Sequence, residues 1–194
     1  MLQIGITGGI GSGKSIVCEV FKSLGVPVYH SDERAKFFIN SDTQIICKIK
    51  NCFGNNIYWQ DNKIDRHALA KIVFNNKESL ELLNSIIHPI VNEDYQSWIN
   101  KQNQAKYILK EAAIIFESDT YKNLNYIICV SAPEKLRIER VKKRDNSSQK
   151  EIEKRILNQI SDKERKKRSD FILNNDGTEL LLPQILKLHN KFNK

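Results

Sequence analysis

The sequence predicts an α/β fold in which a mostly parallel sheet carries helices on both faces. Short apolar runs suited to buried strands alternate with stretches whose apolar residues recur at helical spacing. A glycine-rich turn also joins the first of these strands to the first helix. The 194 residues suffice for one such domain with its own core and do not require two independent domains. In a sheet of this kind, ligands are expected at the carboxyl ends of the strands.

Five segments are predicted to be strands, namely residues 2–6, 26–29, 106–110, 126–130 and 170–173. Roughly 70 residues separate the second strand from the third, far more than a crossover helix needs. This stretch is predicted to be helical over residues 33–39, 43–52 and 65–74, and again from Pro89 toward Gln102. We therefore expect a helical insertion over residues 33–103, where a second substrate could be held.

The composition restricts the cellular setting of the protein. No apolar stretch approaches the roughly 20 residues of a membrane span, and the chain begins directly with a strand. We therefore expect a cytoplasmic protein with no membrane partner. The cysteines form no C-x-x-C pair and fall on apolar elements, so we expect reduced, buried thiols and no cysteine metal site. They are Cys18, Cys47, Cys52 and Cys129.

Residues 8–15, GGIGSGKS, match the pattern G-x-x-x-x-G-K-[ST]. Glycines let consecutive backbone N–H groups curl around phosphate oxygens, because they tolerate positive φ and carry no Cβ. Lys14 is expected to reach the β- and γ-phosphates, and the Ser15 hydroxyl is expected to bind Mg²⁺. The motif lies between a predicted strand and a predicted helix, whose positive end would face the anion. We infer a phosphate site that uses ATP and Mg²⁺.

The net charge of +8 resides in residues 135–168, which we call the basic segment. It contains 14 Lys and Arg against 6 Asp and Glu, whereas the rest of the chain contains 17 of each sign. A nucleic-acid-binding arm and a lid that closes over a triphosphate are both compatible with such a segment. Two short amphipathic helices are predicted in it, from the spacing of Leu136, Ile138 and Val141 and of Ile152, Ile156 and Ile160. We expect two or three of its arginines to contact ligand.

Among proteins with such a loop, a kinase for a small molecule or nucleotide is favoured. Residues 62–65 read NKID, as in a GTPase, but they follow a polar stretch and no D-x-x-G precedes them. A motor ATPase would need adjacent acids at the end of the third strand, where only Glu111 is present. A kinase needs an acceptor-side carboxylate and lid arginines, and both are available. The prediction is a P-loop NTPase-type three-layer fold with a five-stranded parallel sheet, a helical insertion and a helical lid.

Several blocks together resemble the dephospho-CoA kinase family almost from end to end. They are IGITGGIGSGKS, FGNNIYWQDNKIDRHALAKIVF, LNSIIHPIV, RVKKRD and SDFILNNDG, in the order and spacing of that family. The resemblance implies a coenzyme A domain within residues 33–103 and a lid within residues 134–165. It implies transfer of the ATP γ-phosphoryl group to the 3′-hydroxyl of dephospho-CoA in the last step of coenzyme A synthesis. Another phosphate-loop kinase for a nucleoside monophosphate or small metabolite remains the alternative.

The resemblance also implies roles for individual residues. Asp32 is the proposed acceptor base, with Lys14 and Arg140 as further catalytic groups. Arg66, His88 and Glu111 are assigned to the acceptor substrate. The residues assigned to ATP are Gly11, Ser12, Gly13, Lys14, Ser15, Ile16, Arg144 and Asn175. We expect neither nucleic acid nor a membrane as partner, and the sequence contains no indication of the oligomeric state.

Each acceptor-side assignment has a purely structural alternative. Asp32 could only cap the helix that follows it, and His88 could only make a local hydrogen bond before Pro89. Arg66 could be a surface arginine, and Glu111 could pair with a neighbour instead of ordering a magnesium water. The chain also departs from the family pattern, because His30 stands where an aspartate is usual, while Asp32 is retained.

Overall fold

The computed structural model describes residues 1–73, 76–145 and 148–194 and divides the chain into two compact units. The larger unit contains Met1–His30 and Gln102–Lys194, and the smaller unit contains Ser31–Lys101. Phe74, which ends one predicted helix, lies outside the described residues, as do positions 146–147 of the expected lid.

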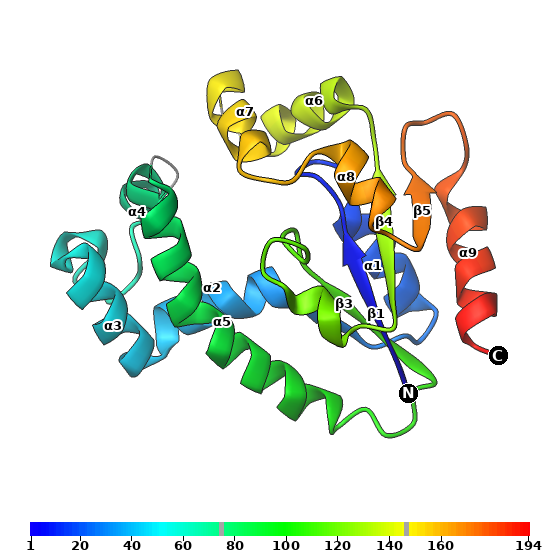
Figure 1. Ribbon diagram of the computed structural model, residues 1–194, viewed down its shortest axis with the longest axis horizontal. Helices are drawn as coiled ribbons and strands as arrows, with labels where there is room; N and C mark the ends of the chain where they lie inside the picture. Colours follow the sequence, from blue (N-terminus) through cyan, green and yellow to red (C-terminus); the bar gives the residue numbers. More distant parts are fainter. Residues whose placement is uncertain (74–75, 146–147) are drawn as a thin grey trace. The chain divides into compact units, whose positions relative to one another are not determined.

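The larger unit is built on a five-stranded sheet whose paired strands all run parallel. Its order is β2-β3-β1-β4-β5, so the strand that precedes the glycine-rich turn lies at the centre (Figure 1). The strands are β1 (Leu2–Thr7), β2 (Val28–His30), β3 (Tyr107–Glu111), β4 (Tyr126–Ser131) and β5 (Phe171–Asn174). This confirms the predicted fold class, and it places the carboxyl ends of the strands at one edge.

Apolar residues on both faces of the sheet form its core. On one face, β-strand residues such as Ile4 and Ile128 pack with α1 (Lys14–Ser23) and α9 (Leu181–Phe192). On the other face, Ile127 packs with Ile115 and Phe116 of the segment after β3, which continues into η2 (Thr120–Asn123). Because neighbouring residues of a strand point to opposite faces, Ile127 and Ile128 serve different layers.

Where the structure describes the basic segment, it forms the helices α6 (Glu134–Asp145), α7 (Gln149–Leu157) and α8 (Asp162–Lys167). α8 was not predicted from sequence. Ser148 and Glu151 form a capping box at the start of α7. The predicted apolar face of α6 is only partly correct, because the buried residues of that helix are Arg137 and Val141. Leu136 and Ile138 are only partly buried.

The described residues of the smaller unit form helices and connections, apart from an isolated bridge between Tyr58 and Ile64. Arg34 forms two hydrogen bonds, of 2.7 and 2.6 Å, to the Asp94 carboxylate and so ties α2 to α5. This bidentate pair fixes the rotation of α2 relative to α5. The elements are α2 (Ser31–Ser41), α3 (Thr43–Phe53), η1 (Asn55–Ile57), α4 (Arg66–Val73) and α5 (Lys77–Ile99).

The prediction that a helix begins at Pro89 is wrong, because α5 begins at Lys77 and contains Pro89 in its interior. Asn76 caps this helix by accepting a hydrogen bond from the Ser79 backbone. Pro89 is exposed, and its missing N–H removes one helical hydrogen bond. The buried face outweighs this loss, because every fourth residue is apolar and packed: Leu83, Ile87, Val91 and Tyr95.

The expectation of four buried cysteines is also wrong for two of them. Cys18 and Cys129 are buried in the larger unit, whereas Cys47 and Cys52 are exposed on α3. The apolar face of α3 is made by Ile45, Ile46 and Ile49, so these two thiols lie outside it. None of the helices in the described part of the chain is long and apolar enough to cross a membrane.

Candidate active site

The glycine-rich turn, residues 8–13, connects the end of β1 to the first residue of α1, and we call it the phosphate loop. Gly11 and Gly13 adopt φ of 78° and 96°, in the left-handed region that glycine favours. Gly13 occupies the N-cap of α1 and, as a glycine, has no side chain that could cap the helix. The first N–H groups of α1 are therefore not taken by a capping side chain and can bind an anion.

Lys14 and Ser15 follow immediately in the first turn of α1. The Lys14 ammonium donates a 3.0 Å hydrogen bond to the carbonyl of Gly8, so the side chain reaches back across the loop. Ser15 is exposed, whereas the Ser12 hydroxyl is buried without a hydrogen-bond partner in the described structure. An ammonium group and two hydroxyl groups therefore line the loop where the motif predicts a bound phosphate.

Glu111 ends β3 next to the strand that leads into the phosphate loop. The parallel register pairs it with Ile6 of β1 and with His30 of β2. Its carboxylate lies 3.5 Å from Nδ1 of His30, and its side chain is about nine-tenths buried. His30 thus contacts the acid at the end of the neighbouring strand.

Arg140 and Asn175 connect α6 and the end of β5 to the phosphate loop. The Asn175 side-chain amide donates to the Ser12 carbonyl at 2.8 Å, and Arg140 donates to the Asn175 carbonyl at 3.1 Å. A Cβ on Gly13 would collide with the Asn175 amide. The Nη1 group of Arg140 is buried without a hydrogen-bond partner among the described residues, so one donor of this arginine remains for a ligand.

Arg144 lies on the same helix but in a different environment. It forms hydrogen bonds of 2.7 and 2.9 Å with the carboxylate of Asp145, which also contacts Arg155 at 3.3 Å. The hydrogen bond from Arg144 lowers the pKa of Asp145, and Asp145 in turn raises the pKa of Arg144. In this arrangement Arg144 contacts a carboxylate instead of the phosphate loop.

The remaining acceptor-side candidates belong to the smaller unit. Asp32 is the second residue of α2, inside its first turn, where the helix dipole favours a carboxylate. Arg66 begins α4 and is exposed. His88 lies in the interior of α5, so its predicted place at a helix start is wrong. The Arg34–Asp94 pair orients the helix that carries Asp32.

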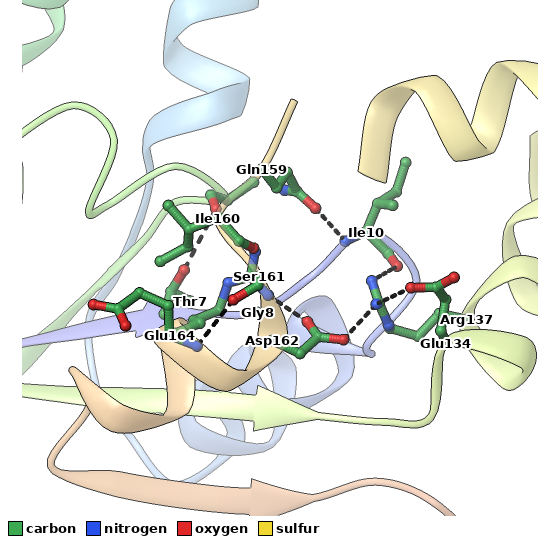
Figure 2. Close-up of polar contacts among 12 residues, drawn as sticks. Thr7, Gly8, Ile10, Glu134, Arg137, Gln159, Ile160, Ser161, Asp162 and Glu164 are labelled. Atoms are coloured by element: carbon green, nitrogen blue, oxygen red, sulfur yellow. Dashed lines mark hydrogen bonds and ion pairs between the residues drawn. The ribbon is translucent and has the colours of Figure 1, made fainter. Parts of the chain in front are cut away.

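The structure also reveals four polar residues around the phosphate loop that the sequence analysis did not single out, and Figure 2 labels three of them, Arg137, Gln159 and Asp162. Gln159 accepts a 3.0 Å hydrogen bond from the Ile10 N–H, and Arg137 donates to the Ile10 carbonyl at 3.3 Å. The other two are Asp162, whose carboxylate forms an ion pair with Arg137, and Arg165, which forms an ion pair with the same carboxylate. The signal available in the sequence was the spacing of Arg137, four positions before the apolar Val141, which places both on one face of a helix. The many charged residues around Arg137 obscured this signal.

A central parallel strand followed by a phosphate loop, an uncapped helix and an arginine-bearing helical segment defines the class of P-loop kinases. The sequence matches the dephospho-CoA kinase family over residues 2–180. We conclude that the chain belongs to the dephospho-CoA kinase family, as its sequence motifs predicted.

Individual relatives extend over almost the whole chain. A dephospho-CoA kinase of Bacteroides fragilis is 39% identical over 187 residues, which cover 96% of this chain and 91% of that protein. The structure of a dephospho-CoA kinase from Campylobacter jejuni is 29% identical, with a TM-score of 0.68 and coverage of 97% and 96%. The protein TT1252 from Thermus thermophilus is 30% identical, with a TM-score of 0.86 and coverage of 98% and 96%.

Proposed function

We propose that this chain transfers the γ-phosphoryl group of ATP to the 3′-hydroxyl of dephospho-CoA, giving coenzyme A and ADP. The observation that carries this proposal is the phosphate loop with its open helix N-terminus, in a chain of the dephospho-CoA kinase family. Phosphoryl transfer requires mainly positioning and the neutralisation of charge on the phosphates. The groups on the larger unit are suited to both tasks.

On the ATP side, backbone N–H groups of Gly11 through Ile16 would surround the β- and γ-phosphates. Lys14 would exchange its contact with the Gly8 carbonyl for the phosphates, because a charged oxygen is a better acceptor than a neutral one. Arg140 would add its buried, unpartnered Nη1 donor as the leaving ADP gains charge. Asn175 would hold the loop from behind, near the adenine end of the nucleotide.

A divalent cation such as Mg²⁺ fits the donors at this edge of the sheet. Mg²⁺ prefers oxygen ligands and keeps several waters, so it needs few protein groups. Ser15 supplies an exposed hydroxyl in the first turn of α1, and Glu111 supplies a carboxylate that can hold a metal-bound water. When bound, the ion would neutralise charge on the β- and γ-phosphates.

On the acceptor side, we assign Asp32 as the general base. Its carboxylate would accept the proton of the 3′-hydroxyl while the new phosphorus–oxygen bond forms and the bond to ADP breaks. Arg66, exposed at the start of α4, would contact a phosphate of dephospho-CoA, and His88 would contribute a hydrogen bond. In addition, we propose that α6 and α7, within residues 134–165, serve as the lid.

An ADP-release assay with alternative acceptors tests this function. We expect turnover with dephospho-CoA and none above background with AMP or shikimate, because the acceptor contacts must match the substrate. A Lys14→Ala preparation made in parallel excludes a contaminating kinase. Preferential phosphorylation of AMP or shikimate would instead show that the chain is a different phosphate-loop kinase.

A further inference from the structure

Arg137 is a charged residue in an environment that normally excludes charge. It is only 2% exposed, although it belongs to the basic segment, where most lysines face solvent. Buried arginines persist when carboxylates and carbonyl oxygens satisfy them. The partners of Arg137 are a carbonyl of the phosphate loop and the carboxylates of Asp162 and Glu134.

The Ile10 peptide groups at the tip of the phosphate loop are held from two sides (Figure 2). The N–H donates to Gln159 Oε1 at 3.0 Å, and the carbonyl accepts from Arg137 Nη1 at 3.3 Å. Gln159 lies in the short connection between α7 and α8, and Asp162 is the first residue of α8. Hydrogen bonds at both groups of one residue restrict the rotation of the adjoining peptide planes, which sets the shape of the loop.

Asp162 anchors this contact to the sheet. Its Oδ2 lies 2.6 Å from Arg137 Nη2, and its Oδ1 lies 2.5 Å from Arg165 Nη1. Arg165 is 1% exposed and also donates to the Ile160 carbonyl at 2.8 Å. Because α8 packs on β4, the ion pair fixes Arg137 relative to the strand beside β1. We call Arg137, Gln159, Asp162 and Arg165 the loop brace.

Two loop glycines are required by the same contact. A Cβ on Gly9 would collide with the Arg137 guanidinium, and a Cβ on Gly11 would lie 2.5 Å from the Arg137 carbonyl oxygen. The guanidinium therefore packs directly against the loop backbone, and α6 approaches closely enough to exclude larger residues. The glycine-rich sequence serves this packing in addition to the phosphate site.

We propose that Arg137 is a positioning residue that, through the loop brace, holds the phosphate loop in the shape that binds ATP. A loop ordered before binding loses less conformational entropy when the nucleotide arrives, and its N–H groups already point at the phosphates. This inference rests on the proposal that the loop binds ATP. It assigns the pair Arg137–Asp162 a role in nucleotide affinity, not in acceptor binding or proton transfer.

Glu134 offers a matched control, because it contacts the same guanidinium at 3.7 Å but is exposed and more distant. We expect Arg137→Gln and Asp162→Asn to raise the KM for ATP roughly tenfold, because small displacements of positioning groups cost tenfold or more. The KM for dephospho-CoA should remain within about twofold in all variants, and Glu134→Gln should resemble the wild type. Steady-state kinetics with each substrate varied in turn measures this.

Two further variants keep the test decisive if Arg137→Gln folds poorly. Gly9→Ala leaves every charge in place but displaces the guanidinium, so it should also raise the KM for ATP. A pocket of about 340 Å³, lined in part by Arg137, Asp162 and Arg165, lies beside the brace and is large enough for a guanidinium ion. Millimolar guanidinium ion should therefore restore ATP affinity to Arg137→Ala but not to Lys14→Ala.

The outcomes separate the two proposals. Equal effects of Arg137→Gln and Glu134→Gln, or a parallel rise of both KM values, would overturn the role of the brace while leaving the kinase function intact. A fall in melting temperature with an unchanged KM for ATP would have the same consequence. A wild-type protein without ATP-dependent activity on dephospho-CoA would instead overturn the proposed function.

Discussion

The phosphate loop and the acceptor-side residues are encoded in different ways. The loop and the first turn of α1 form one contiguous segment, whose shape depends on two left-handed glycines and the start of a helix. The acceptor candidates of the smaller unit, Asp32, Arg66 and His88, lie on three different helices. A contiguous site can be predicted from local backbone preferences, whereas a dispersed site depends on how its helices pack. Substitutions on each side can test this contrast.

The largest effect is expected for Lys14→Ala, which removes the lysine charge at the start of α1. The lysine would act mainly on charge that develops in the transition state, so kcat/KM should fall by roughly 10³-fold or more. Within the loop, Lys14 donates a hydrogen bond to the Gly8 carbonyl, and losing this one contact should change the melting temperature little. Coupled ADP release and a thermal melt measure the two quantities. A variant with a tenth of wild-type activity would contradict this role.

Asp32→Asn tests the acceptor side, whose candidate residues are dispersed over three helices. Asparagine retains the shape of the side chain but cannot accept the proton, so we expect kcat to fall by roughly 10²- to 10⁴-fold with normal ATP affinity. Nucleotide titration and single-turnover kinetics measure these changes.

Asp42 is the matched control, since it caps α3 in the same unit by accepting from Gln44 and Ile45. Asp42→Ala should lower the free energy of unfolding by about 1 kcal/mol without affecting kcat. If Asp32→Asn instead kept a near-normal kcat, Asp32 would be structural and Glu111 would become the candidate for the acceptor-side group.

Substitutions of Arg140 and Arg144 allow a comparison of two arginines on the same helix, α6. Arg140 has a buried unpartnered donor beside the loop, whereas Arg144 already pairs with Asp145. We expect Arg140→Ala to raise the KM for ATP and lower kcat, with a combined loss of at least about tenfold, the value of one charged hydrogen bond. Arg144→Ala should cost less, and the exposed Lys166→Gln should have no effect. A larger loss for Arg144 would show that its pair with Asp145 breaks when substrate binds.

The smallest effect on turnover is expected at Lys110, which is buried in β3, the strand beside the central β1. Burial lowers its pKa from 10.5 to about 8. Between these values the unfolded chain binds a proton that the folded protein does not, so the free energy of unfolding rises with pH across this window. Lys110→Met should lack this rise, whose full size is ~3 kcal/mol. Denaturant unfolding of both proteins at pH 7 and pH 10 measures the difference, which should shrink at the higher pH. A difference independent of pH would contradict the shifted pKa.

The sequence determined the parts of this protein that depend on local pattern. The five strands and the parallel sheet follow from short apolar runs separated by helices, and their predicted positions differ from the structure by one or two residues. The phosphate loop was predicted because glycine spacing, lysine and serine act within one turn of backbone. The family followed from blocks of consecutive residues, such as LNSIIHPIV.

The tertiary structure decided the features in which local rules compete with packing. Pro89 is locally typical of a helix start. In the structure α5 continues on both sides of Pro89, because burial of its apolar face stabilises the helix. The sequence pattern indicates that Arg137 is one of many solvated charges. In the structure it is buried, because it donates hydrogen bonds to Asp162, 25 residues further on, and to the Ile10 carbonyl. Both outcomes depend on partners distant in the chain. A one-dimensional pattern records which groups are available, but whether a buried charge or a missing hydrogen bond is tolerated depends on the groups that folding brings next to it.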